Sequence, residues 1–205
     1  MSWATTDPDR LAARLAGLGF TVNNRRFVDF PAGQIRLIPL ESGPGPERLL
    51  DPRWVPAAPG PAASEPAARS GHPNGVREIV ALGWATVDAD RANAGRPIDS
   101  VDAFSSLPDD AQLGARVRGS LARRPATLLL EPATEGRLAA TLARVGEGPA
   151  ALYLVAAGGL AGIAAGAIGG RAQVRQGPLG PALLLPGPAW GPHLLVVSQR
   201  PTGLR

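Results

Sequence analysis

The first 41 residues combine short strand-like runs with one helical pattern. Leu11, Leu15 and Leu18 recur at the spacing of one helical face, which predicts a helix there. Asp7 is a suitable N-cap, and Pro8 fits the first helical position, where its missing N–H costs nothing. Strands are predicted at 2–6, 20–23, 27–30 and 34–40. The predicted order is therefore strand, helix and three strands, or βαβββ.

The same order is predicted at the other end of the chain. A helix is expected over 160–168, with strands at 150–156, 171–176, 182–185 and 194–199. Residues 149–170 carry no charge, and these 22 residues would be long enough to cross a bilayer as one helix. Gly158 and Gly159 divide this run, however, and its many small residues make it only mildly apolar. We therefore predict a buried strand and a buried helix, and no membrane span.

An almost identical octet links the amino-terminal unit to the middle of the chain. WATTDPDR occupies 3–10, and WATVDADR occupies 84–91. Each copy places a strand-like start before an Asp that can cap a helix. The repeat indicates that one supersecondary unit occurs more than once.

The middle of the chain fits this repeat only loosely. The helix after Asp88 is expected to be short, because Asn93, Gly95 and Pro97 interrupt it. The other predicted elements are a strand at 76–87, a helix from Asp109 or Asp110 to about Arg123, a strand at 127–131, and a helix that Thr134 caps and Gly146 ends. The predicted domains are a first βαβββ module at 1–41, a Pro/Gly-rich linker at 42–75, a degenerate middle module with extra helices at 76–148, and a last βαβββ module at 149–205.

Composition limits the classes of function. The 205 residues are 44% hydrophobic, enough to bury a shared core. All 21 basic residues are arginine, the net charge is only +4 and aromatic residues make up 4%, so nucleic-acid binding is not expected. The absence of Cys excludes thiolate chemistry, and the absence of Lys excludes a Walker phosphate loop and a Schiff base. We expect a cytoplasmic protein, since no secretory signal opens the chain, and a bacterial source from the Arg-rich, Lys-free composition.

Three segments carry a resemblance to a known superfamily. They are RVGEGPAALYLVAAGGL at 144–160, GPLGPALLLP at 177–186 and HPNGV at 72–76. Together with the repeated βαβββ order, they resemble the vicinal oxygen chelate superfamily, which includes glyoxalase-like, bleomycin-resistance-like and dihydroxybiphenyl dioxygenase-like proteins. The resemblance implies an α+β fold in which paired βαβββ modules form half-open mixed β-sheet barrels with helices on the outer face. It also implies a homodimer.

The resemblance further implies where a metal would be held. The superfamily uses a His or Gln in a module's first strand and a Glu in its last strand to bind a divalent ion, which acts as a Lewis acid. In this chain, Ala81 and Ala151 stand at the first-strand positions, and Arg36 and Leu195 stand at the last-strand positions. We therefore expect a divergent member that lacks the metal ligands and uses no metal and no cofactor.

Candidate binding residues follow from the concave sheet that paired modules present. They are Trp3, Arg36, Trp84, Tyr153, Glu41 and Glu131. The aromatic residues combine a large surface with a polar group, and an arginine can hold an anionic or carbonyl group; core packing is the alternative for each aromatic. The two glutamates end apolar strands and become acid/base candidates if they face the barrel interior; exposure beside a turn is the alternative.

The leading hypothesis is a protein with a metal-free concave pocket that binds or sequesters an organic small molecule. The alternative is a metal-independent lyase, isomerase or hydrolase that uses Glu41, Glu131 or Arg36. A third class is a partner-binding protein, which an exposed apolar edge would indicate. The two imidazoles, His72 and His193, are interpreted as a turn residue and a polar group at a strand end.

Overall fold

The structure is a computed structural model that describes residues 1–30, 33–40, 46–50, 72–94, 104–122, 125–133, 135–161, 163 and 173–198. The helices are α1 (Pro8–Gly17), α2 (Ala89–Ala94) and α3 (Arg137–Val145). The strands are β1 (Ser2–Thr5), β2 (Phe27–Phe30), β3 (Gly33–Pro39), β4 (Arg48–Leu50), β5 (Val76–Ala85), β6 (Ser105–Asp110), β7 (Ala115–Ser120), β8 (Ala126–Pro132), β9 (Gly148–Ala156), β10 (Val174–Gly177), β11 (Gly180–Leu184) and β12 (His193–Val197).

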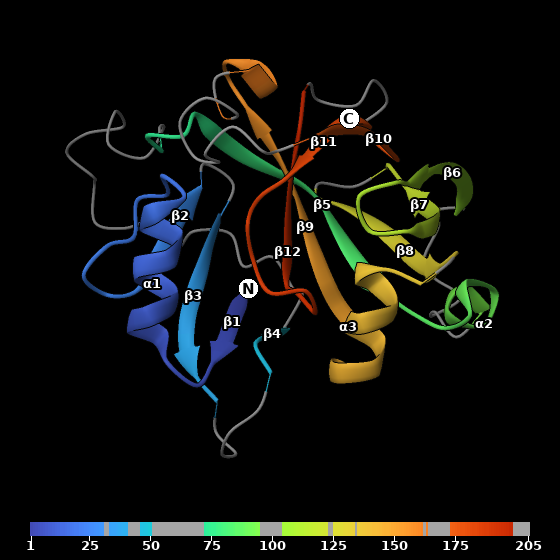
Figure 1. Cartoon of the computed structure of the whole chain (residues 1–205), viewed down its shortest axis with the longest axis horizontal. Coiled ribbons are helices and arrows are strands. Elements are labelled where there is room, and N and C mark those ends of the chain that lie inside the picture. The colour runs from blue at the N-terminus through green and yellow to red at the C-terminus, as the bar shows by residue number, and fades with distance from the viewer. Residues whose placement is uncertain are drawn as a thin grey trace.

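Two units with the same strand order build one mixed eight-stranded sheet, β10-β11-β12-β9-β5-β8-β7-β6. In the unit that starts at β5, the first strand lies parallel to the last strand β8, and β7 and β6 follow antiparallel. The unit that starts at β9 repeats this order, with β12 parallel to β9 and then β11 and β10 antiparallel. The first strands β5 and β9 pair antiparallel at the centre of the sheet, where Figure 1 shows them side by side. The predicted α+β class is therefore confirmed.

The eight-stranded sheet curves until β6 and β10 approach each other. The N–H of Ala111, just after β6, donates to the carbonyl of Gln176 in β10 over 3.2 Å, and the side-chain amide of Gln112 donates to the carbonyl of Gln173 over 2.6 Å. Packed side chains fill the inner face of this curve. They include Ala81, Leu113, Val117, Leu128, Leu130, Leu138, Ala151, Tyr153, Ala182 and Leu195. We call this set the inner core.

A four-stranded sheet with the order β2-β3-β1-β4 packs on the outer face of the large sheet. It contributes Trp3 and Leu37 to a second core, to which α1 adds Leu11 and Leu15. The large sheet contributes Leu82, Leu152, Leu154, Leu183 and Val196, which alternate with inner-core residues along their strands. We call this second core, on the outer face of the large sheet, the outer core. Among the described residues, β7 and β8 contribute no side chain to it. The small sheet therefore covers only part of the outer face.

The helix predicted to begin at Asp109 or Asp110 is wrong. The chain instead forms a hairpin in which β6 ends at Asp110 and β7 runs antiparallel to it. A turn over 111–114 reverses the chain, and Gly114 adopts a φ of 68° there, which suits glycine. The middle unit consequently has the same strand order as the last unit.

The amino-terminal unit also differs from the prediction. The strand expected at 20–23 is wrong, because only a single bridge joins Val22 to Val28. The predicted linker at 42–75 contains β4, which lies antiparallel to β1, although much of the rest of that linker lies outside the described residues. Most of the helix expected at 160–168 also lies outside them, whereas the strand expected at 150–156 is confirmed as β9. No helix in the described part of the chain is long and apolar enough to cross a membrane.

Candidate functional site

The repeated octet forms the same strand-to-helix junction in both copies. In each copy, the hydroxyl oxygen of the Thr that follows Trp-Ala accepts a hydrogen bond from the N–H of the first Asp. The carboxylate of that Asp then caps the helix by accepting the N–H of the Arg at the end of the octet. The first contact measures 3.3 Å at Thr5 and 3.2 Å at Thr86. The second measures 2.9 Å at both Asp7 and Asp88. The Thr, Asp and Arg of the octet thus form the same helix cap in both copies.

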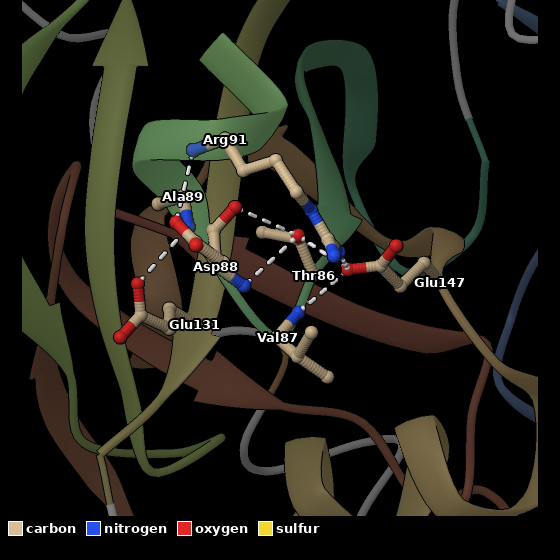
Figure 2. A network of polar contacts seen from close by, with 7 residues as sticks. All are labelled: Thr86, Val87, Asp88, Ala89, Arg91, Glu131 and Glu147. Carbon is tan, nitrogen blue, oxygen red and sulfur yellow. Dashed lines mark hydrogen bonds and ion pairs between the residues drawn. The ribbon is translucent and has the colours of Figure 1, made fainter. Parts of the chain in front are cut away.

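In the second copy, a carboxylate from a distant segment joins this junction. Glu147 lies between α3 and the first residues of β9, and its Oε1 accepts three hydrogen bonds (Figure 2). The donors are the Thr86 hydroxyl at 2.7 Å, the Val87 N–H at 2.8 Å and the Arg91 guanidinium at 2.8 Å. The Thr86 hydroxyl, followed by the Val87 N–H and with a smaller effect of Arg91, lowers the pKa of Glu147. Glu147 is therefore an ionised acceptor at neutral pH.

Glu131 anchors the start of α2 from the other side. Its Oε2 accepts the Ala89 N–H at 3.0 Å, and its Oε1 is ion-paired with Arg116 on β7. Asp90 of α2 is similarly ion-paired with Arg118 on β7. These five residues border a polar hollow of about 250 Å³. Asp109 also borders the hollow, but the ion pairs of Glu131 and Asp90 join α2 and β8 to β7 there, so we interpret this hollow as the attachment of α2 to the sheet.

A second cleft beside α2 has more apolar walls and a volume of about 380 Å³. It is lined by Trp84, Thr86, Arg91, Ala92, Phe104, Thr127, Leu129 and Glu147. Trp84 and Leu129 are direct neighbours on the parallel strands β5 and β8. Leu129 points to the outer face, because Leu128 and Leu130 on either side of it belong to the inner core. The cleft therefore occupies the outer face, where β8 contributes nothing to the outer core among the described residues.

The structure separates the aromatic and arginine residues that were predicted to share one pocket. Trp84 lines the cleft, whereas Trp3 is only 1% exposed and belongs to the outer core. Tyr153 is fully buried in the inner core, where its hydroxyl donates to Asp110 Oδ2 at 2.7 Å. Burial raises the pKa of Tyr153 well above its usual value, with a further contribution from Asp110, so the hydroxyl stays protonated. Arg36 lies exposed on the small sheet.

Of the two predicted carboxylates, only Glu131 lies in the described structure. Glu131 lies near the cleft, but both of its oxygens are engaged at the start of α2. Glu41 lies outside the described residues. Among the described residues, Glu131 therefore anchors α2, and Arg36 lies on a different sheet from it.

Three of the four positions at which the resemblance implies metal ligands lie within packed structure, and the fourth, Arg36, carries a positive charge that would repel a cation. Ala81, Ala151 and Leu195 are all fully buried in the inner core, and their side chains have no donor atom. The expected concave pocket is thus occupied by side chains of the described residues. Nor do three or more His, Cys, Asp or Glu side chains gather anywhere in the described ranges in a way that could hold a metal ion. The residues present at these positions do not fit a divalent ion.

Both histidines make structural contacts. His72 is buried against the rings of Phe20 and Phe30, with ring centroids 5.2 and 5.0 Å away. Burial lowers its pKa, so the ring is uncharged at neutral pH. His193 begins β12, as predicted for a strand-end polar group, and its Nε2 lies 3.0 Å from Thr141 Oγ1 on α3.

Sequence reasoning missed Glu147 and Phe104. Glu147 stands between two glycines in the segment 144–160, which was used only for its resemblance to the superfamily. It lies 61 residues from Thr86, and no spacing in the sequence connects the two. The repeated octet marked the right junction but could not identify the partner that completes it.

No family model matches this chain, and no curated protein matches it. Solved structures similar to it include a variant of Streptomyces coelicolor methylmalonyl-CoA epimerase in complex with 2-nitronate-propionyl-CoA, at 17% identity and a TM-score of 0.48, covering 60% of this chain and 99% of that one. The epimerase from Mycobacterium tuberculosis is 16% identical with a TM-score of 0.48, covering 60% and 88%. A hypothetical protein from Bacillus halodurans C-125 is 14% identical with a TM-score of 0.48, covering 62% and 96%. At these identities and TM-scores, no activity is transferred to this chain.

Proposed function

We propose that this protein binds an organic small molecule in the cleft beside Trp84. The observation that carries the proposal is the cleft itself, about 380 Å³ with aromatic and aliphatic walls and a few polar groups. Small-molecule sites have roughly this size, about 300–1,000 Å³, and this mixture of walls. From the sequence we further expect a cytoplasmic bacterial homodimer.

A comparison within the chain supports binding rather than packing as the role of Trp84. Trp3 holds the same octet position and is 1% exposed, whereas Trp84 is only partly buried and borders the cleft. The strand-to-helix junction at Trp3 forms with its tryptophan buried in a core, so the junction does not require the exposed position that Trp84 occupies. An indole on an accessible cleft wall offers a large contact area and an N–H donor to a ligand.

Binding without turnover agrees with the chemistry of the walls. Glu147 is the acidic side chain among the described lining residues, and its lowered pKa makes it a poor general base near neutral pH. The described lining residues include no imidazole, so binding is proposed to be metal-free. The site can hold and orient a molecule, which suits sequestration.

The proposal is tested by screening aromatic fragments with ligand-observed NMR against the native protein and Trp84→Ala. Removing the indole should weaken binding tenfold or more, the effect expected for a central aromatic contact. Trp190→Ala is the matched control, because Trp190 is also exposed, at 37%, but lies outside the cleft, where the Arg144 guanidinium covers its ring. Circular dichroism should show that both variants remain folded.

Two results would contradict the proposal. One is fragment binding that survives Trp84→Ala unchanged. The other is an equal loss of binding in Trp84→Ala and Trp190→Ala, which would indicate unspecific contact with exposed tryptophan.

A further inference from the structure

The polar end of the cleft presents one acceptor and one donor side by side. Glu147 uses Oε1 for its three hydrogen bonds, while its Oε2 points away from those donors in Figure 2 and receives no hydrogen bond from the described residues. Arg91 contacts Glu147 through Nη2. A guanidinium has five N–H donors, so Arg91 retains donors for another acceptor.

The charges at this end balance. Arg91 and Glu147 form an ion pair at 2.8 Å, and both side chains are partly exposed, at 62% and 41%. A ligand carboxylate would be attracted by the Arg91 guanidinium but repelled by the adjacent Glu147 carboxylate. A protonated ligand amine would be attracted by Glu147 but repelled by Arg91. A neutral group that brings both an acceptor and a donor matches the pair without either repulsion.

The rest of the cleft favours a flat ligand body. Trp84 and Phe104 supply aromatic surface and Leu129 supplies aliphatic surface, all from the walls of the same cleft. Aromatic rings stack on indole in offset or edge-to-face arrangements and gain more than their buried area alone would give. A planar ring can therefore occupy the apolar part while its edge reaches the Arg91–Glu147 pair.

We propose that the cleft selects neutral planar aromatic molecules whose edge carries an N–H donor beside a carbonyl acceptor, as in a cyclic amide. The ring contacts Trp84, the N–H donates to Glu147 Oε2, and the carbonyl accepts from Arg91. This inference rests on the proposed function and specifies its ligand class.

Three probes of similar size test the proposal by isothermal titration calorimetry at pH 7. They are 2-quinolone, which has the amide edge, N-methyl-2-quinolone, which lacks the donor, and 2-naphthoate, which carries a negative charge. We expect 2-quinolone to bind roughly tenfold more tightly than its N-methyl form, the effect of one lost hydrogen bond to a charged group. We expect 2-naphthoate to be the weakest of the three.

Glu147→Gln should reverse part of this order. It removes the negative charge, so the affinity for 2-naphthoate should rise while the advantage of 2-quinolone over its N-methyl form shrinks. Glu47→Gln is the matched control, because Glu47 forms a comparable ion pair with Arg14 at 2.7 Å outside the cleft. This control should leave the order of the three probes unchanged.

The outcomes separate the inference from the function on which it rests. The proposed ligand class would be overturned if 2-quinolone and its N-methyl form bound equally, or if 2-naphthoate bound more tightly than 2-quinolone. The proposed function would still stand in either case, provided that binding depended on Trp84. If none of the probes bound in a Trp84-dependent way while the fragment screen still gave Trp84-dependent binding, the ligand class would fall and the function would stand. The comparison among probes on the native protein decides the inference even if Glu147→Gln does not fold.

Discussion

Acidification should destabilise this protein through His193, at the start of β12. The side chain is 3% exposed, and its Nε2 lies 3.0 Å from Thr141 Oγ1. Burial, with a smaller contribution from the positive charge of Arg137, lowers the pKa of His193 from 6.5 to about 4. At pH 5 the imidazole is therefore neutral in the folded protein and largely protonated in the unfolded chain.

The sign and size of the effect follow from this pKa. Between pH 6.5 and about 4 the unfolded chain binds more protons than the folded one, so the free energy of unfolding falls as the pH falls. The contribution of His193 is fully present above pH 6.5 and is lost as the pH approaches 4. A pKa lowered from 6.5 to about 4 corresponds to about 3 kcal/mol, since one pKa unit is worth about 1.4 kcal/mol.

Urea unfolding of the native protein and His193→Gln, followed from neutral pH to pH 4, measures this contribution. The native protein should lose about 3 kcal/mol more than the variant over that range, whatever the difference between them at neutral pH. Other titrating groups, including His72, affect both proteins and cancel in the difference. Parallel curves for the two proteins would refute the burial argument for His193.

Two further comparisons test the packing and the repeat. Gly83→Ala should lower the free energy of unfolding in urea by about 1–3 kcal/mol, because a Cβ there would lie 2.6 Å from Leu130 Cδ1 in the inner core. Gly187→Ala is the control: a Cβ there would have nothing within 4 Å, so stability should change by less than about 0.5 kcal/mol. Equal costs for the two variants would contradict the packing argument. Asp7→Ala and Asp88→Ala each remove a helix N-cap and should each lower the free energy of unfolding by about 1 kcal/mol. Only Asp88→Ala should also weaken fragment binding in the NMR screen, because Asp88 caps α2, which borders the cleft. A loss of binding in both variants would count against the cleft as the binding site.

Much of the fold could be predicted from local signals. The N-cap at Asp7, the apolar spacing along α1 and the compact strand β9 are decided by neighbouring residues, and the structure retains them. The hairpin of β6 and β7 was mistaken for a helix because Leu113 and Val117 fit a helical spacing as well as a strand alternation. Which period applies depends on the sheet beside the segment, where Val117 packs inward and Arg116 points out to the Glu131 carboxylate.

The candidate site was only partly predictable, for a different reason. A strand has two faces, and the sequence alone does not say which one borders a cavity. Tyr153 and Trp84 were therefore predicted together, although Tyr153 faces the inner core and Trp84 faces the outer cleft. Glu147 reaches Thr86 only because β5 and β9 pair antiparallel, which brings the end of one strand to the beginning of the other.

The hydrogen bond from Ala111 to Gln176 affects the tendency of this fold to aggregate at high protein concentration. An open sheet ends in two strands whose outward N–H and C=O groups can pair with another chain and seed aggregation. Here the two outermost strands, β6 and β10, turn toward each other, and Arg175 also donates to the carbonyl of Ala111 at 3.5 Å. The curvature that fills the interior with side chains thereby leaves fewer edge groups of the large sheet open to another copy of the chain than a flat sheet would, although the small sheet still ends in the edge strands β2 and β4.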